Sequence, residues 1–373
     1  MAESYGKKDK KRSENKKVEG ETYFQEKQME GRMKREKILL LVLVLMTTLT
    51  MVLCAGGQAE ESVANYPEKE IEAVITWGAG GLTDNIARNF IPLMEERLDG
   101  ASIVPQNKSG ASGALGSQYV INKPADGYTI LITTTESAGV WNVMGTSDLD
   151  VNDFQPIILL SSLIPTCYVK ADAPWDTVEE LISDAKSRPG KIISGYAAPG
   201  SLGHVSALLF AKHSDTQFNM VPFGGGGKVT AALLGGHVDV AFNPLITVMA
   251  NHQAGKIKIL STFSNEKLLE EVPALGAVVP SFSEVLPYGV MVMILVKKDT
   301  PAPIVEKLTA AAADAMKDPK WQEFADKYYL QLMGDTGDDF WEKINNWKPT
   351  TTWLLYEAGV ATKSPADFDI PKK

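Results

Sequence analysis

A glycine-rich turn between a short apolar run and a helical pattern is the segment of this sequence best suited to binding an anion. Residues 74–77 are Val-Ile-Thr-Trp, and residues 78–84 read Gly-Ala-Gly-Gly-Leu-Thr-Asp. Glycines let the backbone adopt positive φ and approach a ligand closely, while the first N–H groups of a helix and the helix dipole point at that ligand. We therefore expect this turn to bind an anion through backbone groups and short hydroxyl side chains.

Three further segments repeat this arrangement, at residues 107–113, 195–203 and 223–227, each between a β-type run and a helical pattern. A single turn of this kind is an ordinary loop of an α/β fold. Four of them at one end of parallel strands favour a ligand site, because α/β sheets bind ligands at the carboxyl ends of their strands. Trp77, Tyr196 and Phe223 flank three of these turns, either as walls of a small pocket or as core aromatics.

Two of the turns resemble nucleotide-binding motifs without matching them. The dinucleotide pattern G-x-G-x-x-G has Thr83 at its last position, and no acidic residue follows at a strand end about twenty residues on. The pattern of a phosphate loop around residues 227–228 fails at both of its ends. We therefore expect no nucleotide cofactor.

Enzymatic chemistry is a weaker alternative. Residues 110–114 approach the G-x-S-x-G motif of serine hydrolases, with Ala114 in place of the last glycine, so an exported esterase using Ser112 or Ser201 stays as an alternative. The histidines show no metal-ligand spacing, and only His204, beside the second glycine turn, is a candidate for ligand contact. We expect no catalysis and no metal.

The first part of the chain has the pattern of an export signal. Residues 1–32 are polar and charged, which indicates a disordered extension or an over-long start; translation from Met33, or secondly from Met29, would remove it. Residues 33–59 combine a basic start, an apolar run of about sixteen residues and a tail of small residues, as a signal peptide does. Cleavage after Ala59 and lipidation of Cys54 are alternative outcomes, as is a retained anchor. We expect an extracytoplasmic or periplasmic protein.

The mature chain is acidic and has no internal disulfide. Residues 1–37 hold twelve Lys or Arg and eight Asp or Glu, so their removal changes the net charge from −9 to −13. Such a surface disfavours nucleic acid as a partner and gives no long-range attraction for anions. Cys167 lies in an apolar run and is expected to be a buried structural thiol. We expect a monomer.

The order of elements predicts two lobes. Strand and helix patterns alternate over residues 71–134 and again over residues 191–242, which is typical of parallel sheets with crossover helices. Long β-type runs at residues 154–170 and 286–296 bracket the second unit, and three helical patterns follow. Two lobes joined by two crossings, with a ligand between them, are the plan of a clamshell binding protein.

At these residues the chain resembles the substrate-binding receptors of tripartite tricarboxylate transporters, the Bug-type periplasmic receptors, from Tyr66 to about Thr362. The motifs that carry the resemblance are Tyr66-Pro67, Trp77 with Gly80-Gly81 and Thr83-Asp84, the turn from Asn107 to Gly116, Pro124-Ala125-Asp126-Gly127-Tyr128-Thr129, Val221-Pro222-Phe223, and Leu233-Leu234-Gly235-Gly236-His237-Val238-Asp239. Each is weak alone, whereas together they are specific.

The resemblance implies a type II-like periplasmic binding fold: α/β, with a mainly parallel sheet flanked by helices in each lobe and the ligand in the cleft. Lobe 1 is expected to comprise residues 66–163 and 292–373, and lobe 2 residues 164–291. The implied ligand is a small organic carboxylate, such as a di- or tricarboxylate, delivered to the permease subunits of a membrane transporter. A receptor that signals to a sensor kinase is the alternative partner.

In that family two loops grip a ligand carboxylate, and by position they are residues 77–84 and 196–204 here. The implied ligand-binding residues are Trp77, Gly80, Gly81, Leu82, Thr83, Asp84, Thr135, Tyr196, Ala197, Gly200, Ser201, His204, Phe223 and Asn243. The chain departs from the family where an aspartate often precedes Asn243, which here follows Phe242, and where Gly224 stands in place of a lysine. The identity of the ligand therefore does not follow from the resemblance.

Overall fold

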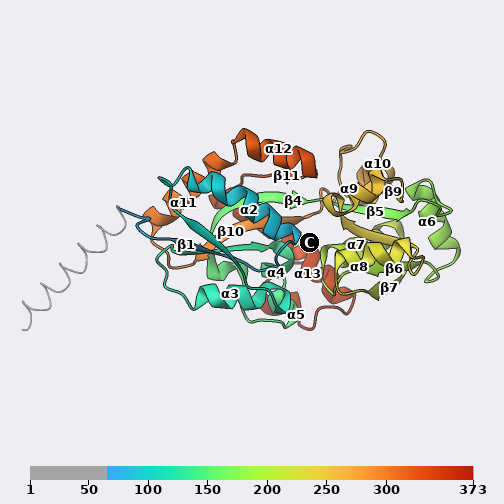
Figure 1. The fold of residues 1–373 in the computed structure, drawn as a ribbon. Coiled ribbons are helices and arrows are strands. Elements are labelled where there is room, and N and C mark those ends of the chain that lie inside the picture. Colours follow the sequence, from blue (N-terminus) through green and yellow to red (C-terminus); the bar gives the residue numbers. More distant parts are fainter. Residues whose placement is uncertain (1–64, 373) are drawn as a thin grey trace, which may run out of the picture. The chain divides into compact units, whose positions relative to one another are not determined.

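The computed structural model describes residues 65–372, and within residues 67–372 two β-sheets are flanked by helices (Figure 1). Sheet A has six strands in the order β11-β4-β10-β3-β1-β2, and sheet B has five in the order β7-β6-β8-β5-β9. In Figure 1 sheet A lies on the left and sheet B on the right. The α/β class expected from the sequence is confirmed. Residues 33–59 and Cys54, to which the sequence assigns export and lipidation, lie outside the described residues.

The strands of sheet A are β1 (Ile71–Ile75), β2 (Ile103–Asn107), β3 (Thr129–Thr134), β4 (Phe154–Leu163), β10 (Val290–Lys297) and β11 (Gln331–Leu332). Those of sheet B are β5 (Pro165–Lys170), β6 (Ile193–Tyr196), β7 (Asn219–Pro222), β8 (Val240–Pro244) and β9 (Ile257–Thr262). The helices are α2 (Leu82–Glu95), α3 (Ala114–Ile121), α4 (Thr135–Ala138), α5 (Trp141–Met144), α6 (Val178–Ser187), α7 (Leu202–Ser214), α8 (Gly226–Leu234), α9 (Leu245–Gln253), α10 (Leu275–Val278), α11 (Ala302–Ala315), α12 (Pro319–Tyr328) and α13 (Gly337–Glu357), with short 3₁₀ turns at Ala111–Gly113, Val151–Asp153, Pro280–Phe282 and Pro365–Phe368.

The four glycine turns each connect a strand to the helix that follows it. In sheet A, β1 pairs in parallel with β2, and the two strands lead into α2 and into the 3₁₀ turn before α3. In sheet B, β6 pairs in parallel with β7, and they lead into α7 and α8. Parallel neighbours end at the same edge of a sheet, so the turns of each sheet lie side by side, as predicted.

The sheets are mixed, so the expectation of mainly parallel sheets is wrong in this detail. β10 pairs antiparallel with both β3 and β4, and β11 pairs antiparallel with β4. In sheet B, β5 runs antiparallel to β8 and β9. β4, β5 and β10 lie next to the two places where the chain crosses between the sheets. A strand that enters a sheet by such a crossing is not part of a β-α-β unit, so it can pair antiparallel with its neighbours.

The first crossing divides the long β-type run at residues 154–170. β4 ends at Leu163 in sheet A, and β5 begins at Pro165 in sheet B. The chain returns to sheet A at β10, whose first residue, Val290, pairs with Leu163. The lobe boundaries at residues 163/164 and 291/292 stay a proposal. The division of the strands supports the first boundary, whereas the second falls inside β10, two residues after its start.

Helix α2 runs unbroken through Pro92, although a proline inside a helix commonly kinks or splits it. Proline removes one backbone hydrogen bond, but Phe90, Ile91, Leu93 and Met94 around it are buried. Burying a side chain of this size stabilises by about 1.5–3 kcal/mol, so packing of the helix outweighs the lost bond, and the helix does not split.

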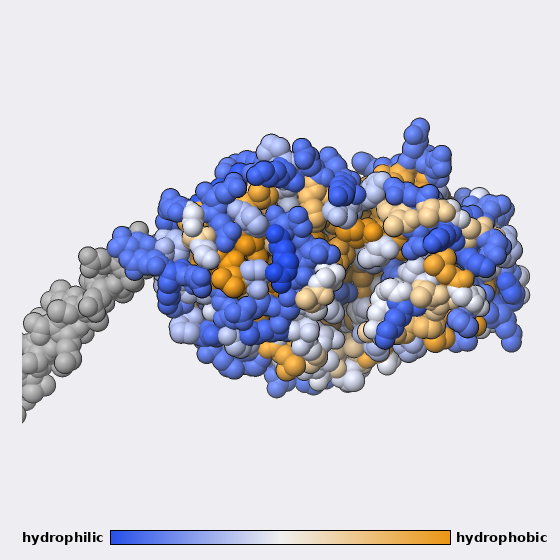
Figure 2. All heavy atoms as spheres, viewed as in Figure 1, coloured by the Kyte–Doolittle hydropathy of each residue, from blue (hydrophilic) through white to orange (hydrophobic). Residues whose placement is uncertain are grey.

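The core of sheet A consists of its own apolar strands and the helices over them. In β10, the seven residues Val290–Val296 are all buried, and so is all of β3. Cys167, in β5, is also buried, and burial raises the pKa of its thiol, as expected for a structural cysteine. In the view of Figure 2, hydrophilic residues cover most of the surface, and hydrophobic residues are visible in the hollow between the half with sheet A and the half with sheet B.

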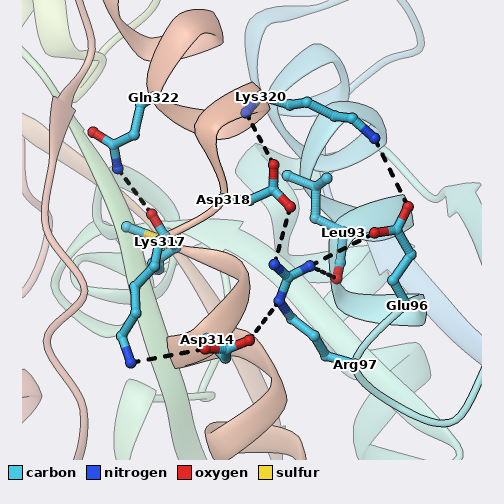
Figure 3. Close-up of polar contacts among 9 residues, drawn as sticks. Leu93, Glu96, Arg97, Asp314, Lys317, Asp318, Lys320 and Gln322 are labelled. Atoms are coloured by element: carbon cyan, nitrogen blue, oxygen red, sulfur yellow. Dashed lines mark hydrogen bonds and ion pairs between the residues drawn. The ribbon is translucent and has the colours of Figure 1, made fainter.

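Arg97, just after the end of α2, links this helix to α11 and α12, the two helices that follow β10 (Figure 3). Its Nε donates to Asp314 Oδ2 in α11 at 2.8 Å, and its Nη2 donates to Asp318 Oδ2 at 2.9 Å. Asp318 also accepts from the N–H of Lys320 and thereby caps α12. This network of hydrogen bonds joins segments more than 200 residues apart in the chain. It helps to fix the position of α2, whose N-terminus follows the first glycine turn.

Candidate functional site

A cavity of about 220 Å³ is lined by residues from both halves of the molecule. From the sheet A half it is lined by Trp77 after β1, by residues of the segment 109–113 after β2, by Glu136 in α4, and by Trp141 and Met144 in α5. From the sheet B half it is lined by Ala198–Ser201, immediately before α7. The cavity therefore lies at the carboxyl ends of β1, β2, β3 and β6, the place at which open α/β sheets bind ligands. Figure 1 shows α4, α5 and α7 close to the junction of the two halves.

The loop after β1 is held largely by its own hydrogen bonds. The N–H of Gly80 donates to Asp84 Oδ2 at 2.8 Å, and the N–H of Gly81 donates to the carbonyl of Gly78 at 3.1 Å. Gly80 has φ of +74°, a conformation that favours glycine. Trp77 donates its indole N–H to Thr134 Oγ1 at 3.1 Å. The two glycine N–H groups expected to bind a ligand thus stabilise the loop in this structure.

Asp84 organises this loop. Its side chain is 3% exposed and accepts from Gly80, from Asn107 Nδ2 at 2.8 Å and from Arg88 Nε at 2.8 Å. Burial opposes its ionisation, but the three donors and the positive charge of Arg88 outweigh burial and hold the pKa of Asp84 below its ordinary value. Asp84 is therefore an internal anchor, and its charge is already compensated.

The loop before α7 is the second expected jaw. The hydroxyl of Ser201, at the N-cap position of α7, accepts from the N–H of Ala198 at 3.2 Å, and this leaves the hydroxyl proton available to a ligand. The N–H of Gly200 donates to His204 Nδ1 at 3.2 Å, and the imidazole stacks on Tyr196 with ring centroids 4.1 Å apart. Burial lowers the pKa of His204 to about 4, so the ring is neutral at neutral pH.

Glu136 connects the two halves across the cavity. Its Oε2 accepts the N–H of Leu202, the first residue of α7, at 2.8 Å. A carboxylate at a helix N-terminus is favoured by the free N–H groups and the dipole. Burial raises the pKa of Glu136 to about 7, and the bond from Leu202 opposes that rise. Sequence reasoning missed this residue; the one available signal was an acid directly after a buried strand, at its carboxyl end.

The segment 109–113 belongs to one of the four glycine turns expected at the ligand site, although none of its residues was among the expected ligand-binding residues. Ala111 and Ser112 are non-glycine residues with φ of +47° and +51°, between Gly110 and Gly113, which also have positive φ. Such a conformation is strained for residues with a Cβ and often occurs at ligand sites. The indole N–H of Trp141 donates to the carbonyl of Ser112 at 2.9 Å and holds the segment in place. The hydroxyls of Ser109 and Ser112 then line the cavity.

Of the expected ligand-binding residues, Trp77, Gly200 and Ser201 line this cavity. Others lie in the two loops beside it without lining it, namely Gly80, Gly81, Leu82, Thr83, Asp84, Tyr196, Ala197 and His204. Gly200 lies against the other half, since a Cβ built on it would be 3.5 Å from Met144 Cε and 4.0 Å from Leu355 Cδ1. The structure thus brings part of each loop to the same cavity.

Three expected site residues have structural contacts elsewhere. Asn243 is 2% exposed and donates to Tyr168 Oη at 2.7 Å and to the carbonyl of Gly226, inside the sheet B half. Thr135 Oγ1 accepts from the N–H of Met291 at 3.1 Å and so ties α4 to β10. Phe223 packs against the apolar cluster of the sheet B half. None of the three lines the cavity described above.

A larger cavity, of about 510 Å³, lies where β10 and α13 approach the crossing segment before β10. Glu284, Lys343 and Trp347 are among its lining residues. Within residues 65–372, no group of three or more His, Cys, Asp or Glu side chains is placed to hold a metal ion. In the same part of the chain, no helix combines the length and apolar character needed to cross a membrane.

A two-sheet α/β scaffold with a small cavity between its halves is the arrangement expected of a clamshell solute-binding protein. Within that class, residues 86–345 match the model of the tripartite tricarboxylate transporter family receptor, TctC, so the chain belongs to this family. A curated relative, the UPF0065 protein in the gbd 5′ region of Cupriavidus necator, is 30% identical over 285 residues, which cover 74% of this chain and 84% of the relative. The family resemblance found in the sequence is confirmed.

Solved structures agree with the family. The chain is similar to a TctC solute-binding protein from Polaromonas, with a TM-score of 0.66, 28% identity, and coverage of 79% of this chain and 100% of that chain. It is similar to the periplasmic binding protein BugD, with a TM-score of 0.68, 25% identity, and coverage of 79% and 99%. The structure of R. palustris Rpa4515 with adipate has a TM-score of 0.68 and 25% identity, and the match covers 80% and 99%.

Proposed function

We propose that this chain is an extracytoplasmic receptor that captures a small organic carboxylate between its two halves and delivers it to the membrane permease of a tripartite tricarboxylate-type transporter. The observation that carries the proposal is the cavity at the carboxyl ends of β1, β2, β3 and β6, closed from the other side by the N-terminus of α7. Family membership and the relative solved with adipate support a carboxylate as the ligand. Export fits the signal-like segment 33–59, and we propose a monomer that acts without a cofactor.

The lining offers donors suited to a carboxylate. Ser201 has its hydroxyl proton available at the start of α7, and the hydroxyls of Ser109 and Ser112 come from the strained segment. Hydrogen bonds to a charged group contribute about 1.5–3 kcal/mol each, and a helix N-terminus adds about 0.3–1 kcal/mol. Three or four such bonds can supply the roughly 8 kcal/mol of micromolar binding after the costs of association. No arginine is needed.

Isothermal titration calorimetry of the mature protein with a panel of small carboxylates tests this function. Ser201→Ala removes the side chain of a residue that lines the cavity, and Thr83→Val removes a hydroxyl near the end of the other jaw, beside the cavity. Both should weaken binding severalfold and leave the unfolding midpoint nearly unchanged. Ser283→Ala, an exposed serine away from the cavity, is the matched control. Unchanged affinity in both site variants would refute the assignment of the two loops.

The alternative of an esterase has less support. Among the described residues no histidine hydrogen-bonds to the hydroxyl of Ser112 or Ser201, and His204 Nδ1 is engaged by the N–H of Gly200. A serine nucleophile needs a base within hydrogen-bond reach. If an ester-hydrolysis rate is measurable and survives in both Ser112→Ala and Ser201→Ala, these serines are not its source. Pull-down of the mature protein with membrane extract, with and without ligand, separates transport from signalling to a sensor kinase.

A further inference from the structure

Glu136 lies where a bound carboxylate would come close to it. Of the described residues that line the cavity, Glu136 alone carries an acidic or basic side chain. The cavity has a volume of about 220 Å³, so a ligand that fills it lies against Glu136. The N–H of Leu202, which Glu136 accepts, belongs to the helix end at which the ligand carboxylate is proposed to bind. The two carboxyl groups would therefore share one small site.

The carboxyl group of Glu136 has one oxygen that accepts no hydrogen bond from the described part of the chain. The N–H of Leu202 reaches Oε2 at 2.8 Å, and Oε1 is left without a donor. The residue is partly exposed, and no lysine or arginine is among the lining residues. A protonated carboxyl group accepts through one oxygen and donates from the other. Glu136 can therefore keep its bond to Leu202 and, when protonated, donate from Oε1.

The elements packed against α4 bring no uncompensated charge to Glu136. β3 and the segment 109–113 have no titratable side chain, and Lys297, at the end of β10, donates to a backbone carbonyl. The buried titratable side chains of the segment before β10, of α7 and of α13 are Tyr288, His204 and Lys348. Burial keeps Tyr288 and His204 neutral, because it raises the pKa of the tyrosine and lowers the pKa of the histidine to about 4. Lys348 pairs with Asp150.

We propose that binding of the carboxylate is coupled to the uptake of one proton from the solvent, which protonates Glu136 and allows this residue to donate a hydrogen bond to the ligand. The proposal rests on the function proposed above, because it takes a carboxylate ligand as given. The proton adds to Oε1, while Oε2 keeps the bond from Leu202, and no other bond forms or breaks. Like a pair of acids in one catalytic site, the two carboxylates would repel each other if both stayed ionised in surroundings of low polarity.

Glu136 is the member of this pair that takes the proton. Burial already raises its pKa to about 7, whereas a small carboxylic acid in water has a pKa of about 4–5. A second carboxylate beside it raises the pKa further, because a like charge disfavours the ionised form. The ligand therefore stays ionised and accepts from Glu136 and from the donors of the two jaws.

Titration calorimetry in two buffers of different ionisation enthalpy counts the protons taken up. The mature protein is titrated at pH 8 with succinate, adipate and hexanoate, in Hepes and in Tris. Each probe that binds should take up about one proton, because a group with a pKa of about 7 is almost fully ionised at pH 8. At pH 6 the uptake should nearly vanish, and affinity should fall roughly tenfold from pH 6 to pH 8.

Glu136→Gln assigns the proton to this residue. Glutamine resembles the protonated acid, because its oxygen can accept the N–H of Leu202 and its amide group can donate to the ligand. The variant should take up no proton and should bind equally well at pH 6 and pH 8. At pH 8 it should therefore bind roughly tenfold tighter than the wild type. Glu284→Gln, the same substitution in the larger cavity, should keep the uptake and the pH dependence of the wild type.

The outcomes separate this inference from the function on which it rests. Binding at pH 8 without proton uptake would overturn the inference and leave the carboxylate receptor intact. Uptake that persists in Glu136→Gln would also overturn it, since another group would then bind the proton. If none of the three probes binds the wild-type protein at pH 6, both proposals fail. The buffer comparison uses the wild type, so it does not depend on the variant being folded.

Discussion

Glu136 should also make the stability of the ligand-free protein depend on pH in a direction opposite to that of most carboxyl groups. Glu136→Gln is the appropriate perturbation, because glutamine has nearly the same shape and can accept the N–H of Leu202, yet stays neutral at every pH. Burial raises the pKa of Glu136 from its ordinary value of 4.5 to about 7. The folded state therefore binds the proton of Glu136 more tightly than the unfolded state does.

The sign and size of the effect follow from this difference. Stability contributed by proton binding at Glu136 is fully present below about pH 4.5 and is lost as the pH rises through about 7. A tenfold change in proton affinity corresponds to about 1.4 kcal/mol, so the loss amounts to at most about 3 kcal/mol. Because part of the side chain faces the cavity, where water can enter, we expect about 1–3 kcal/mol.

Urea denaturation of wild type and variant at pH 4.5, 6 and 8, with ligand removed, measures the difference directly. The free energies of unfolding of wild type and variant should be most similar at pH 4.5. As the pH rises, the wild type should lose stability relative to the variant. Glu357→Gln is a control of opposite sign, because hydrogen bonds and charge from Lys372 and Lys212 lower the pKa of Glu357. A difference between wild type and Glu136→Gln that stays constant from pH 4.5 to 8, or that moves in favour of the wild type, would refute the reasoning.

Two further predictions concern the second jaw and the scaffold. Burial lowers the pKa of His204 from 6.5 to about 4, so stability from its neutral form is present above pH 6.5 and is lost as the pH falls through about 4. His204→Gln should therefore remove up to about 3 kcal/mol of the decline in stability between pH 6.5 and 4, and an equal decline in variant and wild type by urea denaturation would contradict this. Arg97→Ala should lower the free energy of unfolding by about 1–2 kcal/mol, because Asp314 and Asp318 lose their partner in a partly exposed network. The loss should shrink in 1 M salt, and a loss independent of salt would assign the effect to packing of the arginine stem.

The local signals in the sequence were sufficient to predict the strands and helices that flank the candidate site. Glycine turns between an apolar run and a helical pattern are set by residues close together in the chain, and the structure has β1 leading into α2 and β6 into α7 as predicted. The run at residues 154–170 likewise kept its β character. Its division at Ile164 into strands of different sheets agrees with the lobe boundary that the family resemblance implied. The hydrophobic pattern alone does not show this division, because strand pairing depends on partners such as β10, more than a hundred residues away.

Strand direction shows the same limit. Residues 165–169 are all buried, and a strand buried on both faces fits either a parallel or an antiparallel neighbour. The direction of β5 follows from the crossing that precedes it, where the chain enters sheet B beside β8 and β9. Mixed sheets are therefore a consequence of the path of the chain, which hydrophobic patterning does not encode.

Glu136 is the residue of the cavity lining that sequence reasoning was least able to find. Glu136 belongs to none of the motifs that identify the family, so a resemblance carried over motif by motif passes it by. Its environment is made by Leu202, 66 positions later in the chain, and by tryptophans from two other segments. The family motifs place glycine turns beside the cavity, where the N–H groups of Gly80, Gly81 and Gly200 bond within their own loops. Side chains that the fold brings to the cavity singly, such as the acid Glu136, lie outside these motifs, so only the structure identifies them.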